Sequence, residues 1–268
     1  MRQIFPVRAG ESGRQLGPAD PLRSAGPVKP PADGAVGDLI AALGEIYAYP
    51  DRTWVKANMV ASVDGAVTLD GRSGGLSGPA DRLVFSVLRS LADVIVVGAG
   101  TASAERYRQA QPGELWQQLR AGRPPAPPIA VVTRNLGLEL TDRLFGPAGP
   151  RTMVLTTEQL PEDRRKEASR VADVIVAGAD SVTAASMVDA LARRGHRRIL
   201  VEGGPTLLGQ LAAEHLLDEL CLTISPVLEG GQSTARITAR RGPAEVTGMR
   251  LAGLLEDDGF LLSRYLRA

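Results

Sequence analysis

The spacing of hydrophobic residues changes several times along the chain, and each change marks a different element. Apolar residues recur every three or four positions over Asp38 to Tyr47 and over Pro79 to Leu91, which predicts two helices that each bury one face. Trp54 to Ser62 and Asp93 to Val97 are mostly apolar instead, which is typical of strands buried on both faces. After its first residues, the chain is therefore predicted to alternate between helices and strands.

The same alternation continues through the middle of the chain. Short runs of Val, Ile and Leu alternate with longer segments of helical spacing, the pattern of a mostly parallel sheet with helices on both faces. The strands are predicted at Ile129 to Thr133, Thr152 to Thr156, Val174 to Val176 and Arg198 to Val201, and the helices at Pro161 to Ser169, Val182 to Arg194 and Thr206 to Glu214.

The two ends of the chain follow other patterns. Glu219 to Val227 is a long predicted strand, and the segments Met249 to Glu256 and Phe260 to Leu266 flank Asp257-Asp258-Gly259, which favours a tight hairpin turn. Residues 1–35 are rich in Pro, Gly, Ala, Asp and Arg and are interpreted as a mostly irregular arm. The sequence thus predicts one α/β domain over 36–268, with a mostly parallel central sheet and an antiparallel C-terminal hairpin.

Composition narrows the possible functions. The 268 residues carry a net charge of +1 and are 44% hydrophobic, so the chain can bury a core and has no global field for nucleic acid or membrane. A single cysteine, Cys221, excludes an intrachain disulfide and a Cys-based zinc site, and its apolar surroundings predict a buried core residue. His196 and His215 are expected at the surface, so catalysis that depends on a histidine base is not expected. Without a signal peptide or an apolar span, a cytoplasmic location is expected.

Two glycine-rich turns lead from a predicted strand towards a helix and are candidates for phosphate binding. Val97-Gly98-Ala99-Gly100-Thr101 resembles a dinucleotide-binding fingerprint, but Ser103 stands at the third glycine position. A tight structural turn explains that segment as well. Glu202-Gly203-Gly204-Pro205-Thr206 combines two glycines, a helix start with free N–H groups, and a carboxylate. The alternative for this turn is a structural role with an exposed Glu.

A third predicted strand is followed closely by an acidic residue. Asp64-Gly65 follows the strand that ends at Ser62, and ligands of α/β sheets usually bind at the edge where strands end. Asp64 is therefore a candidate for substrate contact, and the alternative is a common Asp-Gly turn. All three turns follow strands, so they could meet at one edge of the sheet.

Together these segments resemble the reductase domain of bacterial riboflavin-biosynthesis deaminase–reductases, from about Trp54 to Arg267. Glu105 with Tyr107 looks like the stand-alone actinobacterial branch. The zinc motif of the deaminase half is absent from the sequence, so only reduction is expected. The segments that carry the resemblance are Ala61–Gly65, Leu88-Arg89 followed by Asp93–Gly98, Gly100-Thr101 with Glu105, Glu202–Leu207, and Leu217–Leu220 running into Ile224–Pro226.

The resemblance implies the fold and the reaction. The fold would be dihydrofolate-reductase-like, the hydride donor NADPH, and the product the ribityl form of 5-amino-6-(5-phosphoribosylamino)uracil. Hydride would pass to an imine carbon of the opened sugar, and Glu202 or water would supply the proton. The apolar C-terminal strands are expected to pair across a twofold axis, as in the homodimers of this family.

The resemblance also assigns site residues by position. Glu202 and Asp64 are the candidate catalytic residues, although Asp64 could instead support its strand end. Arg134 either pairs with the 2′-phosphate of NADPH or is an ordinary solvated arginine. The other expected cofactor contacts are Val60, Thr101, Glu105, Gly203, Gly204, Pro205, Thr206, Leu207 and Leu208, and the expected substrate contacts are Asn58, Ser73, Arg89 and Glu202.

Two departures from the family pattern leave the substrate open. Asn58 stands where the family usually has Lys, and the segment Arg106 to Pro112 does not match the family's run of substrate-contacting residues. One alternative is therefore a pteridine such as dihydrofolate as the reduced molecule. The other alternative is a non-catalytic nucleotide-binding homologue.

Overall fold

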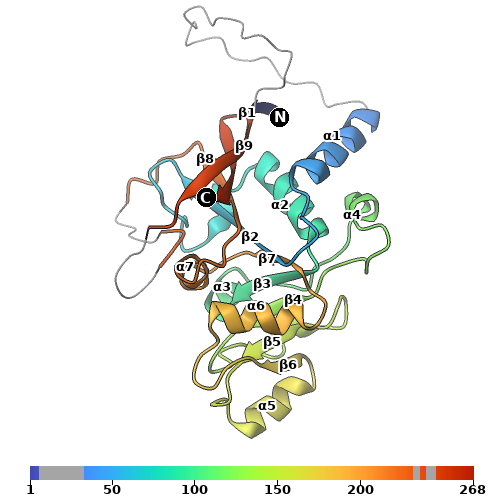
Figure 1. Ribbon diagram of the computed structural model, residues 1–268, viewed down its shortest axis with the longest axis vertical. Helices are drawn as coiled ribbons and strands as arrows, with labels where there is room; N and C mark the ends of the chain where they lie inside the picture. Colours follow the sequence, from blue (N-terminus) through green and yellow to red (C-terminus); the bar gives the residue numbers. More distant parts are fainter. Residues whose placement is uncertain (6–32, 232–235, 240–245) are drawn as a thin grey trace, which may run out of the picture.

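The described part of the chain folds around one twisted sheet. The computed structural model describes residues 1–5, 33–231, 236–239 and 246–268 (Figure 1). Within them the sheet has ten strands in the order β1-β9-β10-β8-β2-β7-β3-β4-β5-β6. The strands are β1 Arg2–Phe5, β2 Trp54–Ser62, β3 Val94–Gly98, β4 Ile129–Val132, β5 Met153–Thr156, β6 Asp173–Val176, β7 Arg198–Val201, β8 Glu219–Ser225, β9 Met249–Asp257 and β10 Phe260–Arg267.

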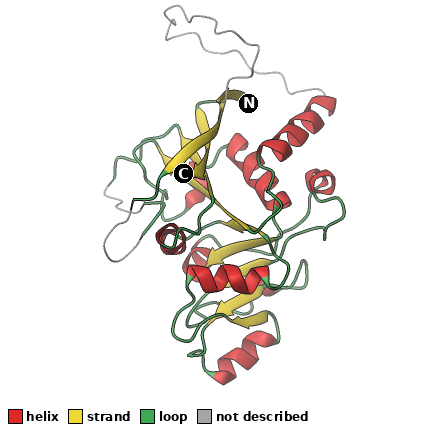
Figure 2. Cartoon of the chain, in the orientation of Figure 1, coloured by secondary structure: helices red, strands yellow, loops and turns green. Residues whose placement is uncertain are grey.

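Helices pack along the sheet, as the colours of Figure 2 show. None of the helices in the described residues is long and apolar enough to cross a membrane. The helices are α1 Asp33–Ile46, α2 Pro79–Leu91, α3 Ala99–Ala104, α4 Glu114–Leu119, α5 Glu162–Ser169, α6 Ala184–Ala192 and α7 Pro205–Ala213, with short 3₁₀ helices η1 at Ser73–Leu76 and η2 at Arg143–Phe145.

The strands from β8 through β6 run parallel, and β1, β9 and β10 add an antiparallel edge. This confirms the predicted α/β class with a C-terminal hairpin. The hairpin turn is formed by Asp258 and Gly259, which both have positive φ angles of 48° and 80°, as a tight primed turn requires. Strand β7 lies between β2 and β3 although it follows them by about a hundred residues. Its insertion brings the ends of these three strands together.

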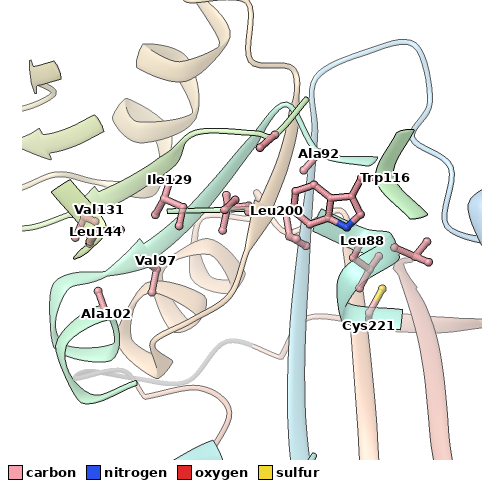
Figure 3. Packing of buried hydrophobic residues seen from close by; sticks show 14 of the residues in the cluster. Leu88, Ala92, Val97, Ala102, Trp116, Ile129, Val131, Leu144, Leu200 and Cys221 are labelled. Carbon is pink, nitrogen blue, oxygen red and sulfur yellow. The ribbon is translucent and has the colours of Figure 1, made fainter. Parts of the chain in front are cut away.

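Two hydrophobic cores cover the two faces of the sheet. Along β3, Ile95 and Val97 belong to the core beneath α1, α2 and α4, while Val94 and Val96 belong to the core beneath α6 and α7. The alternation follows from the strand period of two, and it explains why these strands are apolar throughout. Figure 3 shows part of the first core, with Trp116 of α4 packed near Leu88 and Leu200. Cys221 is buried in the same core, as predicted.

Most predicted elements lie within two residues of their observed bounds. Strand β8 ends earlier than predicted, at Ser225, because Pro226 has no N–H for the ladder. The sequence did not predict α4, a short helix anchored by Trp116, whose indole N–H donates to Ser86 Oγ at 2.8 Å. Nor did it predict β1, which belongs to the segment expected to be an irregular arm and pairs with β9. Residues 6–32 of that arm lie outside the described residues.

Candidate functional site

A cavity opens where β2, β3 and β7 end side by side. Asn58 and Val60 come from the last half of β2, Gly98 ends β3, and Glu202 follows β7 directly. The cavity has a volume of about 690 Å³, within the usual range for small-molecule sites. Ten of the predicted residues line it: Asn58, Val60, Ser73, Arg89, Thr101, Glu105, Glu202, Gly203, Gly204 and Pro205.

The two glycine turns contact each other at the back of the cavity. The Gly98 N–H donates to the Gly203 carbonyl at 2.9 Å. A Cβ built on Gly98 would be 3.4 Å from the Gly204 nitrogen, and one on Gly204 would be 2.3 Å from Thr101 Oγ1. Gly203 has φ +101°, in the region that favours glycine. The glycines therefore allow the two turns to pack tightly together, and Gly100, Gly203 and Gly204 line the cavity.

Helix α7 begins directly after these glycines, with Pro205 in its first turn. The first N–H groups of a helix have no partner within the helix, and they bear partial positive charge. Such groups suit phosphates where they face a ligand. Pro205 lines the cavity but has no N–H, so the backbone of Gly203 and Gly204 just before it is the part of this segment that fits the phosphates of a dinucleotide.

Glu202, which lies between β7 and the glycine turn at Gly203, is the centre of a polar cluster. Arg89 Nε donates to Oε1 and Arg89 Nη2 to Oε2, both at 2.7 Å. The Tyr107 hydroxyl donates to Oε2 at 2.8 Å. The Glu202 side chain is only 2% exposed, so this bidentate pair is shielded from solvent and has a fixed geometry. Phe85 lies one turn before Arg89 on α2. The centre of its ring is 4.2 Å from the guanidinium carbon of Arg89.

The cluster shifts the pKa values of Arg89 and Tyr107. Burial works against the charge of Arg89, but the adjacent Glu202 carboxylate outweighs burial and raises the Arg89 pKa. Burial, followed by the charge of Glu202, raises the pKa of Tyr107 well above its usual value. At neutral pH, Arg89 is therefore charged and Tyr107 keeps its proton. Arg89 lines the cavity, and its Nη1 makes no hydrogen bond to Glu202, so this nitrogen is a candidate donor to a ligand.

Glu105 and Ser73 meet at the cavity rim. Glu105 is the C-terminal cap of α3, and its Oε1 accepts the Ser73 backbone N–H at 2.7 Å. Ser73 is the first residue of η1. A residue expected at the cofactor and one expected at the substrate are thus directly bonded.

Asp64 lies outside the cavity lining and holds a turn together. Ser62 Oγ donates to Asp64 Oδ1 at 2.5 Å, and the N–H groups of Gly230 and Glu229 donate to its carboxylate at 3.0 and 3.2 Å. The Ser62 bond first, then the two backbone bonds, lower the Asp64 pKa to about 2. Of its two expected roles, the geometry places Asp64 in support of the strand end.

Four other predicted residues do not line the cavity either. Arg134 follows β4 and is exposed. Thr206 is also exposed, in the first turn of α7, whereas Leu207 and Leu208 are buried in the core beneath α6 and α7. The two leucines can approach a ligand only through backbone atoms.

Sequence reasoning missed the roles of Phe85 and Tyr107. Phe85 could have been found, because residues four apart on a helix share one face and Arg89 was already a candidate. Tyr107 was noted only as a mark of the stand-alone branch, and no local pattern placed it at Glu202. It reaches Glu202 because the chain reverses at Arg106, whose φ is +52°, and such a left-handed residue is uncommon outside glycine.

Comparison with known proteins places the chain in a family. The family model of the RibD C-terminal domain matches residues 53–259. A 2,5-diamino-6-ribosylamino-4(3H)-pyrimidinone 5′-phosphate reductase of Archaeoglobus fulgidus is 32% identical over 189 residues, which are 69% of this chain and 86% of that protein. A RibD protein of Chlamydia muridarum is 27% identical over 68% of this chain and 48% of its own length.

Solved structures agree on the fold. A pyrimidine reductase-like protein from Corynebacterium diphtheriae has a TM-score of 0.76 at 27% identity, over 84% of this chain and 98% of its own. RibD of Acinetobacter baumannii has a TM-score of 0.63 at 18% identity, over 81% and 58%, and supports the fold alone. Because the family model covers more than half of the sequence and the cavity contains its motif residues, the chain belongs to the RibD C-terminal domain family of riboflavin-pathway pyrimidine reductases.

Proposed function

We propose that this protein is an NADPH-dependent reductase that converts 5-amino-6-(5-phosphoribosylamino)uracil to the ribityl product. The observation that carries the proposal is the joining of two features in one cavity. The glycine turns at Gly100 and Gly203 line the cavity, and the Glu202–Arg89 pair stands beside them. A cofactor and a polar substrate would meet between these features.

On the cofactor side, the proposed contacts come from three strand ends. Val60 and Thr101 border the cavity, and Gly203 and Gly204 offer backbone N–H groups to the phosphates. Glu105 also borders the cavity, but its carboxylate is bonded to the Ser73 N–H. Bound here, the cofactor supplies the hydride. Arg134 is the proposed partner of the 2′-phosphate, because it is exposed after β4 on the same edge of the sheet. An Arg134→Ala variant tests that role by its NADPH and NADH affinities.

On the substrate side, Glu202 is proposed to act as an acceptor and not as the proton source. Both of its oxygens already accept hydrogen bonds from Arg89 or Tyr107. The two bonds from Arg89 to Glu202 fix the guanidinium group, so that Nη1 can donate to a carbonyl or phosphate oxygen of the substrate. Asn58 and Ser73 supply further polar contacts from the walls. Water is then the proposed source of the proton.

A second candidate substrate differs at one ring position. Three relatives at 27–32% identity are 2,5-diamino-6-ribosylamino-4(3H)-pyrimidinone 5′-phosphate reductases. That pyrimidinone has an amino group where the uracil has an oxygen. A donor such as Arg89 Nη1 favours the oxygen if it faces that position, and a free acceptor favours the amino group.

The experiment is a turnover assay that follows NADPH oxidation with the uracil, the diamino pyrimidinone and dihydrofolate in parallel. Reduction of the uracil with the highest kcat/KM supports the proposal. Preference for the diamino compound or for dihydrofolate would replace the proposed substrate. If no compound is reduced and NADPH fluorescence does not change on binding, the reductase proposal fails.

A Glu202→Gln variant tests the cluster itself. The amide keeps the size of the side chain but removes the charge that holds Arg89, so kcat/KM should fall roughly a hundredfold, the scale for breaking a shielded charge pair. The Kd for NADPH should change less than about threefold. Glu139→Gln is the control, because Glu139 is exposed and lies outside the cavity. An equal loss of NADPH affinity and turnover would place Glu202 at the cofactor instead.

A further inference from the structure

One hydrogen bond joins the two walls of the cavity. Glu105 ends α3, the helix that follows the first glycine turn, and its carboxylate accepts the backbone N–H of Ser73 at 2.7 Å. The two residues are 32 positions apart. Because the acceptor is charged and the donor belongs to the backbone, this bond fixes the path of the chain at Ser73 and not merely one side chain.

The segment that Glu105 holds is a compact turn. The N–H groups of Leu69 and Arg72 each donate to the other residue's carbonyl, at 2.8 and 3.0 Å. Asp70 and Gly71 between them have positive φ angles of 50° and 77°. At the far end, Leu76 is 1% exposed and anchors η1. We name residues 69–76 the Ser73 turn.

Leu76 anchors one end of the Ser73 turn in the core, and the Glu105 carboxylate holds its cavity side at Ser73. Within the part of the chain that the structure describes, the Glu105–Ser73 bond is the one hydrogen bond between this turn and the end of α3. Gly71, Ser73 and Gly74 of the turn all line the cavity. Gly74 and Arg72 are exposed. Without the bond, the middle of the turn could move away from the cavity while Leu76 stays in the core.

We infer that Glu105 is a positioning residue that holds the Ser73 turn in the shape that faces the substrate. It acts through the Ser73 N–H and not through direct contact with the reacting atoms. The inference rests on the proposed function for the identity of the substrate, but the bond and the turn do not depend on it. Loss of the carboxylate should therefore weaken substrate binding, release the turn, and leave cofactor affinity nearly unchanged.

Limited trypsin digestion tests the release of the turn without any substrate. Cleavage after Arg72, followed by mass spectrometry of the intact chain, reports opening of the backbone next to Ser73. Glu105→Ala should be cleaved there about tenfold faster than the parent, the scale set by losing a hydrogen bond to a charged group. Glu105→Gln retains an acceptor and should lie between them. Ser73→Ala keeps the backbone N–H and should be cleaved at the parent rate.

Two results of the digestion would overturn the inference. Equal cleavage of Glu105→Ala and the parent, within twofold, would show that the bond does not hold the turn. Faster cleavage at all arginines together with a lower melting temperature would show general unfolding. A comparable melting temperature with faster cleavage only after Arg72 supports the inference.

Kinetics with the pyrimidine separate positioning from cofactor binding. Glu105→Ala should raise KM for the substrate about tenfold, with kcat and the NADPH Kd each within about threefold. Ser73→Pro removes the same bond from its other side, because proline has no N–H. The extended φ and ψ of Arg72, −133° and 148°, suit a residue before proline. Ser73→Ala serves as the control for loss of the hydroxyl.

The double variant Glu105→Ala with Ser73→Pro should show the KM of either single variant and no further loss, because both changes remove one bond. Additive losses would overturn the inference, and so would a tenfold rise in the NADPH Kd without any effect on KM. If the parent reduces no pyrimidine, the proposed function fails, and the trypsin result still decides whether Glu105 holds the turn.

Discussion

At the scale of single residues, Gly204 shows how sterics outweigh local preference. It is the N-cap of α7, a position where Ser, Thr, Asp and Asn are usually favoured because their side chains accept an N–H of the first turn. Here a Cβ would lie 2.3 Å from Thr101 Oγ1, far inside van der Waals contact. Glycine is therefore favoured here by the Thr101 side chain of the neighbouring α3 and not by the helix itself.

A Gly204→Ala variant should lose about 1–3 kcal/mol of unfolding free energy, the usual cost of forcing a methyl group into packed space. Removing the obstructing atom should relieve this cost, so Thr101→Ala with Gly204→Ala should be less destabilised than the sum of the two single variants. Urea unfolding measures all four proteins. Gly100→Ala is the matched control, because its Cβ would meet no atom within 4 Å. Strictly additive losses would contradict the contact.

The residues of the site were predictable to different degrees. Glu202 and Arg89 could be predicted because each follows or belongs to an element with a clear pattern, and they meet as a bidentate pair. Asp64 had two expected roles, and only the positions of Glu229 and Gly230, 165 and 166 residues away, favour the supporting one. Contacts over such distances have no local signal in the sequence.

At the scale of elements, an ion cluster links three strands inside the sheet. Glu219 of β8 is fully buried, 3.1 Å from Lys56 Nζ on β2 and 2.7 Å from Arg264 Nε on β10. Trp54 donates to it at 3.0 Å. Burial opposes the charge of Glu219, but Lys56 and the hydrogen bond of Arg264 outweigh it and lower the Glu219 pKa. The cluster joins the parallel strands to the antiparallel edge.

Removing Glu219 should cost about 3–5 kcal/mol, because Lys56 would then be a buried charge without its partner. A Glu219→Leu variant measures this loss by urea unfolding. Adding Lys56→Met should recover part of it, since no unpaired charge then remains in the core. Arg264 is partly exposed and can turn towards solvent. If the double variant is less stable than Glu219→Leu alone, the charge of Lys56 is not the cause of the loss.

Elements could be predicted wherever local pattern decides them. Trp54–Ser62 and Pro79–Leu91 were predicted at their observed bounds, because continuous apolar runs and a helical face arise from nearby residues. Arg2–Phe5 is a strand because β9 supplies its hydrogen bonds, so its structure depends on residues about 250 positions away. Glu114–Leu119 is too short to establish a period.

At the scale of the whole molecule, the order of the strands determines the site. The periodicity predicts a parallel sheet, but it does not say that β7 inserts between β2 and β3. The sequence predicted only that the three turns could meet at one edge of the sheet, and the order itself is seen in the structure. Its consequence is that the cavity draws on the end of each of these strands, so ligand binding and the folding of the sheet are linked.

This linkage predicts that the cofactor stabilises the described domain as one unit. Because a single sheet runs from β1 to β6, unfolding should show one cooperative transition and no separate N-terminal unit. NADPH at about 100 times its Kd should add about 2.7 kcal/mol, a rise of about 5–10 °C in melting temperature for a chain of this size. Calorimetry measures both properties. Gly204→Ala should reduce the rise, because the distorted turn would hold the phosphates poorly. Two transitions, only one of which moves with NADPH, would instead show that the part of the sheet around β2, β3 and β7 folds apart from the rest.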